Sequence, residues 1–533
     1  MADAVVIGAG PNGLVAANLL ADQGWEVTVL EEASEPGGAV RSGELVEPGF
    51  THDMFSAFYP FTLASPHIQK LELERWGLNW AWSRIAVAHP TRDGTCPAIS
   101  SDIEETVASL DECAAGDGDA WRELYRLWRQ VRTGALGAFF SPFPPVRPVL
   151  GLLETLGPRE LLRFARFSVL PVRQMGEEHF RADGGTRLLA GNALHADISP
   201  EAALGGVFGW VLCSLAQDHG YPAVQGGAGG ITAALVRRLE ASGGQVLCNQ
   251  RASAIECSDG RARAVLSADA RHPARRAVIA DVGAPQLYRD LLADAPLPPT
   301  LLRDLERFHY DNGTVKVDWT LDGPIPWQAE RARAAGTVHV AEGVDALTRQ
   351  AAQMACRMIP SEPYLVLGQY GAFDSTRAPA GKETAWAYTH VPQQIRGDAG
   401  GELTGAWDER ETEVFADRIE QQVEALAPGF RELIRGRHVF TPRTFEQVNR
   451  NLVGGALNGG TAQLHQQLVF RPVPGLARPE TPIEGLYLGS ASIHPGGGVH
   501  GGPGANAAAA ALAYSRSRLK IRPLSRLSRA FQD

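Results

Sequence analysis

The stretch VVIGAGPNG at residues 5–13 decides how this chain begins to fold. A short apolar run ends at Gly8, and an Ala/Leu-rich stretch of helical character begins at Gly13, which predicts a tight strand-to-helix turn. In such a turn Gly8 permits the bend, Gly10 lets a phosphate approach the backbone, and Gly13 lets the helix pack close to the strand. The helix N-terminus offers free N–H groups and a partial positive charge to a diphosphate.

A second strand supports a dinucleotide site at this turn. With 58 glycines in the chain, one glycine pattern can arise by chance. However, the apolar run Val27–Leu30 ends at Glu31, which has the spacing of roughly 20 residues expected for an acid that binds an adenosine ribose. An ordinary glycine turn is the alternative. We favour the dinucleotide site because strand, turn, helix and acid occur together.

Composition places the chain among globular proteins. Its 533 residues predict roughly two to four domains, and 44% apolar with 21% charged content excludes a disordered chain. The net charge of −10 argues against a general nucleic-acid binder. The six cysteines are scattered, so we expect a cytoplasmic protein with reduced thiols, no dithiol redox centre and no metal site. We expect no signal peptide, and no membrane-spanning helix because no apolar run approaches about 18 residues.

A second glycine motif follows Glu31 directly. Gly37 and Gly38 allow the backbone to pass close to a ligand, and Arg41 is placed to contact a phosphate or a flavin carbonyl. Taken alone, this motif is a turn with a surface arginine. After a ribose-binding acid, it resembles the second signature of the FAD-dependent amine oxidase and phytoene desaturase superfamily. The resemblance implies that the dinucleotide is FAD.

The resemblance extends into the middle of the chain. Residues 49–56 are similar to the segment that runs past the flavin toward the substrate domain, although a polar loop is the alternative for His52 and Asp53. The stretch around Ala252 resembles the one whose backbone meets the adenine ring. The glycines at residues 226–230 do not form a second dinucleotide fingerprint, because no apolar strand precedes them. We therefore expect no separate NAD domain, which disfavours a disulfide reductase.

The last glycine-rich motif is the most specific. An apolar run that contains Gly489 leads into HPGGGVHGGPG at residues 494–504, where six of the last nine residues are glycine. Such a backbone can lie against a flat ligand, and the helix predicted after it would stabilise negative charge on the flavin. The motif, with Gly498, Val499 and His500, resembles those of phytoene desaturases and of phytoene-dehydrogenase-related NAD(P)/FAD-dependent oxidoreductases. Carotenoid enzymes usually differ after the first glycine, so carotenoid specificity is not expected.

Residues 66–219 form a segment with helical patterns. We expect helices at residues 102–110 and 121–131 that belong to a cap. Between residues 121 and 180, nine arginines against five glutamates give a local charge of +4 amid apolar residues. This composition fits peripheral contact with a membrane that supplies a lipophilic substrate. We favour a cap with arginines on its solvent face, because the spacing gives no continuous amphipathic helix.

Residues 296–479 contain strands with period-two alternation. This pattern predicts a sheet with one packed face and one face that lines a cavity. Lys316 is notable because both of its neighbours are apolar. In the flavin amine oxidases that this chain resembles, a lysine on this sheet holds water near the flavin. We favour the alternative of an edge lysine that protects a strand from pairing.

Together these patterns predict an α/β fold with two domains and a tail. A Rossmann-type FAD domain is expected from the discontinuous segments 1–65, 220–295 and 480–520. A mixed-sheet substrate domain with a helical cap is expected from residues 66–219 and 296–479. Residues 521–533 are expected to form a basic tail.

The resemblance implies an FAD-dependent oxidoreductase, a desaturase or dehydrogenase that removes a hydride and a proton from a mostly apolar small molecule. His500 and Lys316 are the candidate catalytic residues. Cofactor contacts are predicted at Gly8, Gly10, Gly13, Glu31, Gly37, Gly38, Arg41, Ala252, Gly489, Gly498 and Val499. Two alternatives stay open: an oxygen-using amine or amino-acid oxidase, which needs a polar or carboxylate-binding pocket, and a binding or assembly protein with structural FAD.

Overall fold

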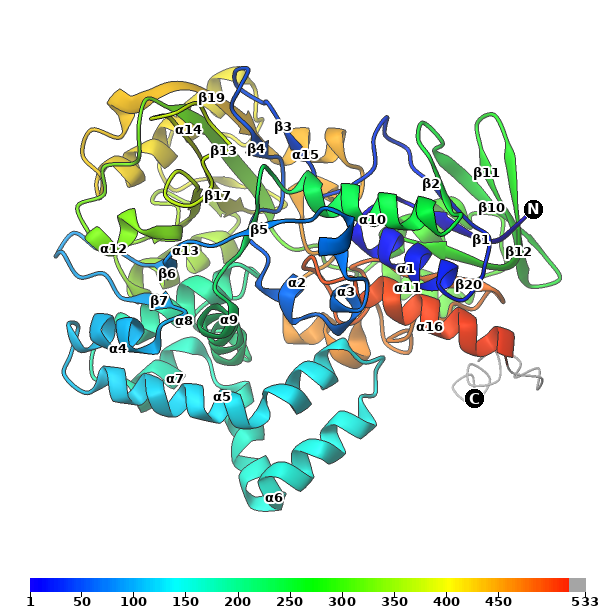
Figure 1. Cartoon of the computed structure of the whole chain (residues 1–533), viewed down its shortest axis with the longest axis horizontal. Coiled ribbons are helices and arrows are strands. Elements are labelled where there is room, and N and C mark those ends of the chain that lie inside the picture. The colour runs from blue at the N-terminus through cyan, green and yellow to red at the C-terminus, as the bar shows by residue number, and fades with distance from the viewer. Residues whose placement is uncertain (517–533) are drawn as a thin grey trace.

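The computed structural model describes residues 1–516, and two seven-stranded sheets form its centre (Figure 1). The first sheet, which contains the N-terminus, lies on the right of Figure 1, and the second sheet lies on the left. Helices from the middle of the chain lie below the second sheet in this view. The predicted α/β fold is confirmed. The basic tail predicted at residues 521–533 lies outside the described residues.

The first sheet joins strands that are far apart in the sequence, in the order β10-β11-β12-β1-β2-β9, with β20 also paired to β12. Its strands are β1 (Ala2–Ile7), β2 (Val27–Leu30), β9 (Gln245–Leu247), β10 (Ala252–Ser258), β11 (Arg261–Ser267), β12 (Arg271–Ala280) and β20 (Leu486–Leu488). Strands β9, β2, β1, β12 and β20 pair in parallel. Parallel pairing brings the carboxyl ends of these strands to one edge, where ligands bind in open α/β sheets.

Both faces of the first sheet are covered, which explains why its central strands are apolar throughout. The helices α1 (Pro11–Ala21), α10 (Gly229–Ala241) and α16 (Gly502–Arg516) pack on one face. Side chains alternate across β1, so Ala4 and Val6 join this helical core. Val5 and Ile7 join the opposite core, which includes residues of α11 (Pro299–Leu305).

The second sheet has the order β19-β13-β17-β16-β14-β6-β7. Its strands are β6 (Ile85–Ala88), β7 (Ala98–Ser100), β13 (Gly313–Leu321), β14 (Ala335–Val340), β16 (Leu365–Gln369), β17 (Glu383–Val391) and β19 (Ile434–Phe440). On β13, Val317 and Trp319 pack in a core with Phe415 of α14 (Glu409–Glu424). Lys316 and Thr314 point to the other face and line a cavity, as the period-two pattern predicts.

The structure corrects the favoured interpretation of Lys316. Strand β13 pairs along its whole length with β17 and on its other side with β19, so it is not an edge strand. The Lys316 side chain is only 2% exposed. A lysine that protects an edge must reach solvent, so the edge interpretation is wrong.

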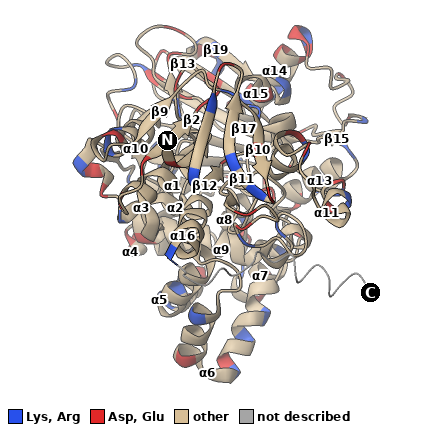
Figure 2. Ribbon diagram, turned by 90° about the vertical axis from the view of Figure 1, so that its right-hand side faces the viewer, with Lys and Arg blue, Asp and Glu red and all other residues tan. Residues whose placement is uncertain are grey.

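The helical cap consists of α4 (Ile103–Asp111), α5 (Asp117–Phe140), α6 (Val146–Val169), α7 (Val172–His179), α8 (Gly184–Leu194) and α9 (Gly205–His219). Buried tryptophans join several of these helices, with Trp128 and Trp210 packed edge to face. The two helices predicted at residues 102–110 and 121–131 are found, and α5 continues further to Phe140. Helices α5 and α6 project from the body of the molecule (Figures 1 and 2). Non-helical geometry at Gly157 kinks α6, so it is not one continuous helix.

Short elements connect the two sheets and the cap. They include β3 (Ser42–Gly43), β4 (His52–Asp53), α2 (Pro60–Ala64), α3 (Pro66–Gln69), β5 (Trp80–Ala81), β8 (Ala223–Val224), α13 (Val344–Ala355) and α15 (Pro442–Val448). Within residues 1–516, no helix has the length and apolar character needed to cross a membrane. The same part of the chain holds no cluster of three or more side chains arranged to bind a metal ion.

Candidate functional site

Two adjoining cavities meet at the turn between β1 and α1. The outer one, called here the nucleotide cleft, has a volume of about 1020 Å³. Six residues predicted to contact the cofactor line it: Gly8, Gly10, Glu31, Gly38, Arg41 and Ala252. The second, called here the inner cavity, has a volume of about 370 Å³ and is lined by the second sheet, the cap and loops at the carboxyl edge of the first sheet. Gly10, Gly38 and Asp281 line both cavities, so a single elongated ligand can occupy the two.

The glycine turn has the close packing that its sequence predicts. Gly8 has a φ of +93°, which favours glycine, and a Cβ on Gly13 would lie only 2.1 Å from the Gly8 carbonyl oxygen. At the N-terminus of α1, the Gly13 N–H donates to Asp281 Oδ2 at 2.8 Å. Burial raises the pKa of Asp281 to about 7. The Gly13 N–H therefore already has a carboxyl partner, and this carboxyl group lies where the two cavities adjoin.

The acid predicted to bind a ribose is held in place by the backbone. Glu31 Oε2 accepts from the Ala9 N–H at 2.8 Å, and Glu31 Oε1 accepts from the Ala33 N–H at 2.9 Å. Arg41 donates from Nε to the Gly38 carbonyl at 3.1 Å and lies over the Phe55 ring at 5.3 Å. These contacts fix both side chains on the cleft wall. A carboxylate with fixed position suits recognition of a diol.

Three of the predicted cofactor residues line neither cavity. Gly13 and Gly37 shape the turns, since a Cβ on Gly37 would lie 2.7 Å from the Val40 carbonyl oxygen. Gly489 lies between β12 and α16, where a Cβ would come within 3.0 Å of Ile279. All three positions allow close packing of backbone. Direct contact between a ligand and Gly489 stays a prediction.

His500 also lies outside both cavity linings, and its place near the reacting carbon stays a prediction. Its Nδ1 accepts from the Gly502 N–H at 3.0 Å, and its Nε2 donates to the Gly497 carbonyl at 3.1 Å. The ring packs against Phe139 and Phe140, and burial lowers the pKa of His500 to about 3. With both nitrogens bonded to backbone, His500 fixes the glycine loop and has no free position for a substrate proton.

The loop before α16 does reach the inner cavity. Gly498 and Val499 line it, and the loop is attached to the segment that carries α2 and α3. Thr62 Oγ1 donates to the Val499 carbonyl, and Ser65 Oγ donates to the His500 carbonyl at 2.6 Å. The N-terminus of α16 follows at Gly502 and contributes its partial positive charge to this end of the cavity.

Lys316 is one of three charged side chains that line the inner cavity. Its Nζ forms an ion pair with Asp318 and lies 5.7 Å from the centre of the Trp386 ring. His52 Nδ1 lies 3.6 Å from the same Asp318 oxygen. Burial lowers the pKa of Lys316, and the Asp318 carboxylate opposes that shift. Burial alone would raise the pKa of Asp318, but the ammonium group holds it below its ordinary value.

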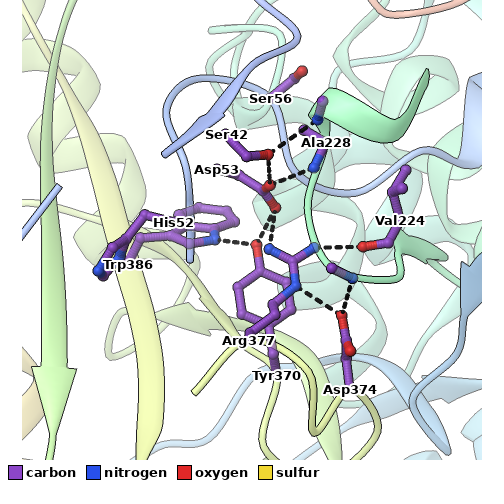
Figure 3. A network of polar contacts seen from close by, with 12 residues as sticks. Ser42, His52, Asp53, Ser56, Val224, Ala228, Tyr370, Asp374, Arg377 and Trp386 are labelled. Atoms are coloured by element: carbon purple, nitrogen blue, oxygen red, sulfur yellow. Dashed lines mark hydrogen bonds and ion pairs between the residues drawn. The ribbon is translucent and has the colours of Figure 1, made fainter. Parts of the chain in front are cut away.

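A second buried ionic network, missed from the sequence, lies beside this pair (Figure 3). Asp53 accepts from Arg377 at 2.8 Å, from the Tyr370 hydroxyl at 2.7 Å and from the Ala228 N–H at 2.7 Å. Arg377 also donates to Asp374 and to the Val224 carbonyl. Asp53 and His52 are buried, so the polar-loop alternative is wrong for both. The network joins β4 and the loop before α10 to the second sheet.

These features define a class of protein. A strand-turn-helix site with a fixed carboxylate, which adjoins a cavity lined by a second sheet, is the arrangement of an FAD-dependent oxidoreductase. The chain belongs to the flavin containing amine oxidoreductase family, whose sequence model matches residues 99–512. A model of the NAD(P)-binding Rossmann-like domain matches residues 6–71, which span the glycine turn and Glu31. The cofactor is FAD, as predicted, and the protein is an FAD-dependent oxidoreductase.

Similar sequences cover almost the whole chain. The chain is 27% identical to "Pyridine nucleotide-disulfide oxidoreductase domain-containing protein 2" of Rattus norvegicus over 547 residues, 95% of this chain and 92% of that protein. It is 24% identical to the phytoene desaturase (lycopene-forming) of Pantoea ananas, over 96% of this chain and 99% of that enzyme. The predicted resemblance to phytoene desaturases is confirmed.

All six cysteines are free thiols, and none lines either cavity.

Solved structures share the fold. An oxidoreductase from Methanosarcina mazei matches with a TM-score of 0.64 at 16% identity and covers 96% of this chain and 99% of its own. Cyclohexylamine oxidase from Brevibacterium oxydans IH-35A matches with a TM-score of 0.57 at 15% identity, over 97% of this chain and 100% of its own. At these identities the match extends to the fold alone.

Proposed function

We propose that this FAD-dependent oxidoreductase removes a hydride and a proton from a mostly apolar small molecule held in the inner cavity. The supporting observation is the lining, in which aromatic and aliphatic side chains from the second sheet, the cap and residues 55–61 surround the space next to Gly498. They include Phe55, Phe58, Phe61, Phe208, Leu212 and Val366. Burial of apolar ligand surface supplies binding free energy there. FAD, when bound, supplies the two-electron acceptor.

We propose that the nucleotide cleft holds the adenosine and diphosphate parts of FAD. Gly8 and Gly10 let the diphosphate approach the N-terminus of α1, Glu31 binds the ribose, and Arg41 lies at the same wall. Gly498 and Val499 then contact the flavin end. The domain division predicted from the sequence fits this assignment and stays part of the proposal. The absorbance spectrum of the purified protein tests this assignment: we expect a yellow flavin spectrum and release of the flavin from the protein on acid denaturation. A colourless protein that FAD cannot reconstitute contradicts the assignment.

We propose Lys316 as the catalytic candidate that remains. It lines the inner cavity, and its ion pair with Asp318 allows it to hold a water molecule or a proton at Nζ. The burial of the pair excludes bulk water from the reacting end of the cavity. Anaerobic loss of the flavin absorbance on addition of substrate measures this role.

An amine oxidase needs a group that binds the substrate ammonium, and the described lining of the inner cavity offers a carboxylate only at its boundary with the nucleotide cleft. Asp281 is the single carboxylate in the lining that the described residues form, and it lies where the two cavities adjoin. Asp53 and Asp318 are already paired with Arg377 and Lys316. An unpaired buried cation is costly, so a charged amine binds poorly here. The other alternative is a binding or assembly protein in which FAD is structural. It predicts that no candidate substrate reduces the flavin, so that the flavin absorbance stays unchanged under anaerobic conditions.

We also propose peripheral membrane contact through α6. Val146, Val149, Leu150 and Leu153 are exposed at helical spacing on the part of the molecule that projects (Figure 2). Exposed arginines flank them, among them Arg147, Arg159 and Arg163. Apolar side chains with adjacent arginines suit an anionic lipid surface. Flotation with vesicles that contain an anionic lipid tests this contact, and recovery of all protein at the bottom of the gradient contradicts it. A cytoplasmic location stays a prediction.

A further inference from the structure

One wall of the inner cavity carries uncharged polar side chains, each with a hydrogen-bonding atom that has no partner within residues 1–516. It is called here the neutral polar wall and consists of His195, Thr337 and Tyr388, with His339 behind His195. Thr337 and His339 lie on β14, Tyr388 lies on β17, and His195 directly follows α8. These residues are separated by up to 193 positions in the chain, and the second sheet brings them together.

The register of the sheet places this wall beside Lys316. His339 pairs with Val366, Val366 pairs with Tyr388, and Tyr388 pairs with Lys316, so the four side chains form one row across adjacent strands. Neighbouring strands are about 4.8 Å apart. The Tyr388 backbone therefore lies about 5 Å from the Lys316 backbone, and the His339 backbone, two strands from Tyr388, lies about 10 Å from the Tyr388 backbone. A small molecule that touches Lys316 can therefore reach Tyr388 and His195.

The two histidines share one hydrogen bond and are neutral. His195 Nε2 lies 2.8 Å from His339 Nε2, so one ring donates and the other accepts. Burial lowers the pKa of His195 to about 3, assisted by His390, and burial lowers the pKa of His339 well below its ordinary value. The second ring nitrogen of His195, Nδ1, has no hydrogen-bond partner among the described residues. It therefore offers the cavity one donor or one acceptor, according to the tautomer.

Tyr388 and Thr337 add two unused hydroxyl groups. The Thr337 side chain is 1% exposed, and its Oγ1 has no partner in the described part of the chain. The Tyr388 hydroxyl likewise has none within residues 1–516, and burial raises its pKa, so it stays protonated. Asp197, whose charge also raises the pKa of Tyr388, accepts from the Asn312 N–H and side chain instead. A buried hydroxyl without a partner, as at Thr337, is uncommon, and together with the partly exposed Tyr388 hydroxyl it suits a ligand that supplies the missing bonds.

No charged group is free to bind an ionic substrate at this wall. The charged side chains of the cavity lining are Asp281, Lys316 and Arg471. Lys316 is paired with Asp318, and Arg471 donates to backbone carbonyls such as those of Thr461 and Ala491. A carboxylate or ammonium group would lose its hydration here without gaining a counter-ion. A hydroxyl or carbonyl group loses much less and gains hydrogen bonds.

We propose that the substrate is an apolar molecule with one uncharged oxygen, a hydroxyl or a carbonyl, that His195, Thr337 and Tyr388 bind. This inference rests on the proposed function and specifies its substrate class. The oxygen binds at the neutral polar wall, and the hydrocarbon part extends along the aromatic lining. Recognition of the oxygen positions the carbon to be oxidised next to Lys316.

Binding of four probes with one chain length to the FAD-loaded protein tests this inference. The probes are decan-1-ol, decane, decanoate and decylamine, and the change in the flavin absorbance spectrum gives each dissociation constant. We expect decan-1-ol to bind at least ten times more tightly than the other three. Tyr388→Phe and the near-isosteric Thr337→Val each weaken decan-1-ol binding about five-fold and leave decane unchanged. Tyr364→Phe is the matched control, because its hydroxyl donates to the Gly191 carbonyl and does not line the cavity.

The outcomes separate the two proposals. Equal binding of decane and decan-1-ol overturns the neutral polar wall and leaves the apolar cavity intact. Tighter binding of decanoate or decylamine overturns the wall and favours an ionic substrate. If none of the probes binds, the apolar substrate proposed above fails together with this inference.

Discussion

The nucleotide cleft and the inner cavity share Gly10, Gly38 and Asp281, yet they are built in different ways. The cleft includes the glycine turns at the carboxyl ends of parallel strands and one fixed carboxylate, Glu31. The inner cavity is formed by side chains from strands of the second sheet and from the cap. The difference separates two tasks: backbone geometry binds a constant cofactor, whereas side chains define a particular substrate. Substitutions in the two regions therefore have distinct, separable effects.

The largest effect is expected from Gly13→Ala in the turn. A Cβ there would lie 2.1 Å from the Gly8 carbonyl oxygen, so α1 must move away from β1. We expect purified protein without bound FAD and a loss of about 1–3 kcal/mol in the free energy of unfolding. Gly151→Ala is the matched control, because no atom lies within 4 Å of a Cβ at that position. Full flavin content in the Gly13 variant would contradict the assigned turn.

Lys316→Met should slow flavin reduction by substrate about 100-fold while FAD content is unchanged. The substitution leaves Asp318 buried without its partner, so stability falls as well. The double variant Lys316→Met/Asp318→Asn should recover stability but not the rate, which separates the two effects. Lys382→Met, at a partly exposed lysine paired with Asp322, is the control. A normal rate of flavin reduction in the double variant removes Lys316 from the mechanism.

Glu31→Gln should weaken FAD binding by about ten-fold, or about 1.4 kcal/mol, and leave the substrate preference unchanged. The amide has only one acceptor oxygen for the Ala9 and Ala33 N–H groups, and it lacks the charge that favours a diol. Titration of the FAD-free protein with FAD measures this change. Glu26→Gln, at an exposed glutamate before β2, should bind FAD normally. Equal affinity in the two variants would show that Glu31 does not bind the ribose.

The smallest effect concerns Asp281 and pH. Burial raises the pKa of Asp281 to about 7, above its ordinary value, so the folded protein binds this proton more tightly than the unfolded chain. Its stabilising contribution is complete at low pH and is lost as pH rises through about 7. From about pH 6 to about pH 8 this loss is roughly 1 kcal/mol of unfolding free energy. Urea unfolding of FAD-free protein should show this decrease in the native protein and not in Asp281→Asn.

The nucleotide cleft could be predicted from the sequence because its determinants are local. Gly8, Gly10 and Glu31 lie within one strand-turn-helix-strand unit, so their spacing alone places them around one ligand. The alternation along β13 was equally informative, because period two assigns Lys316 and its neighbours to opposite faces. A pattern of this kind does not show which strand is at the edge, which explains the error over Lys316.

The inner cavity could not be predicted because its contacts are between distant residues. Asp53 and Arg377 are 324 positions apart, and His195 and His339 are 144 apart. Each of these residues is unremarkable in its own stretch of sequence. His500 shows the converse problem: it lies inside the most specific motif, but both of its nitrogens bond the loop that the motif forms. Motif membership did not distinguish a residue that supports the loop from one that faces the substrate.

Anaerobic mixing of the FAD-loaded protein with candidate substrates tests the central claim most directly. The candidates are neutral apolar alcohols, ketones, polyenes and lipids, set against amines and amino acids, and the flavin absorbance reports electron transfer. We predict that a neutral apolar compound with one oxygen removes the absorbance and that no charged amine does so. Removal by an amine or amino acid, with no response to any neutral apolar compound, would contradict the claim.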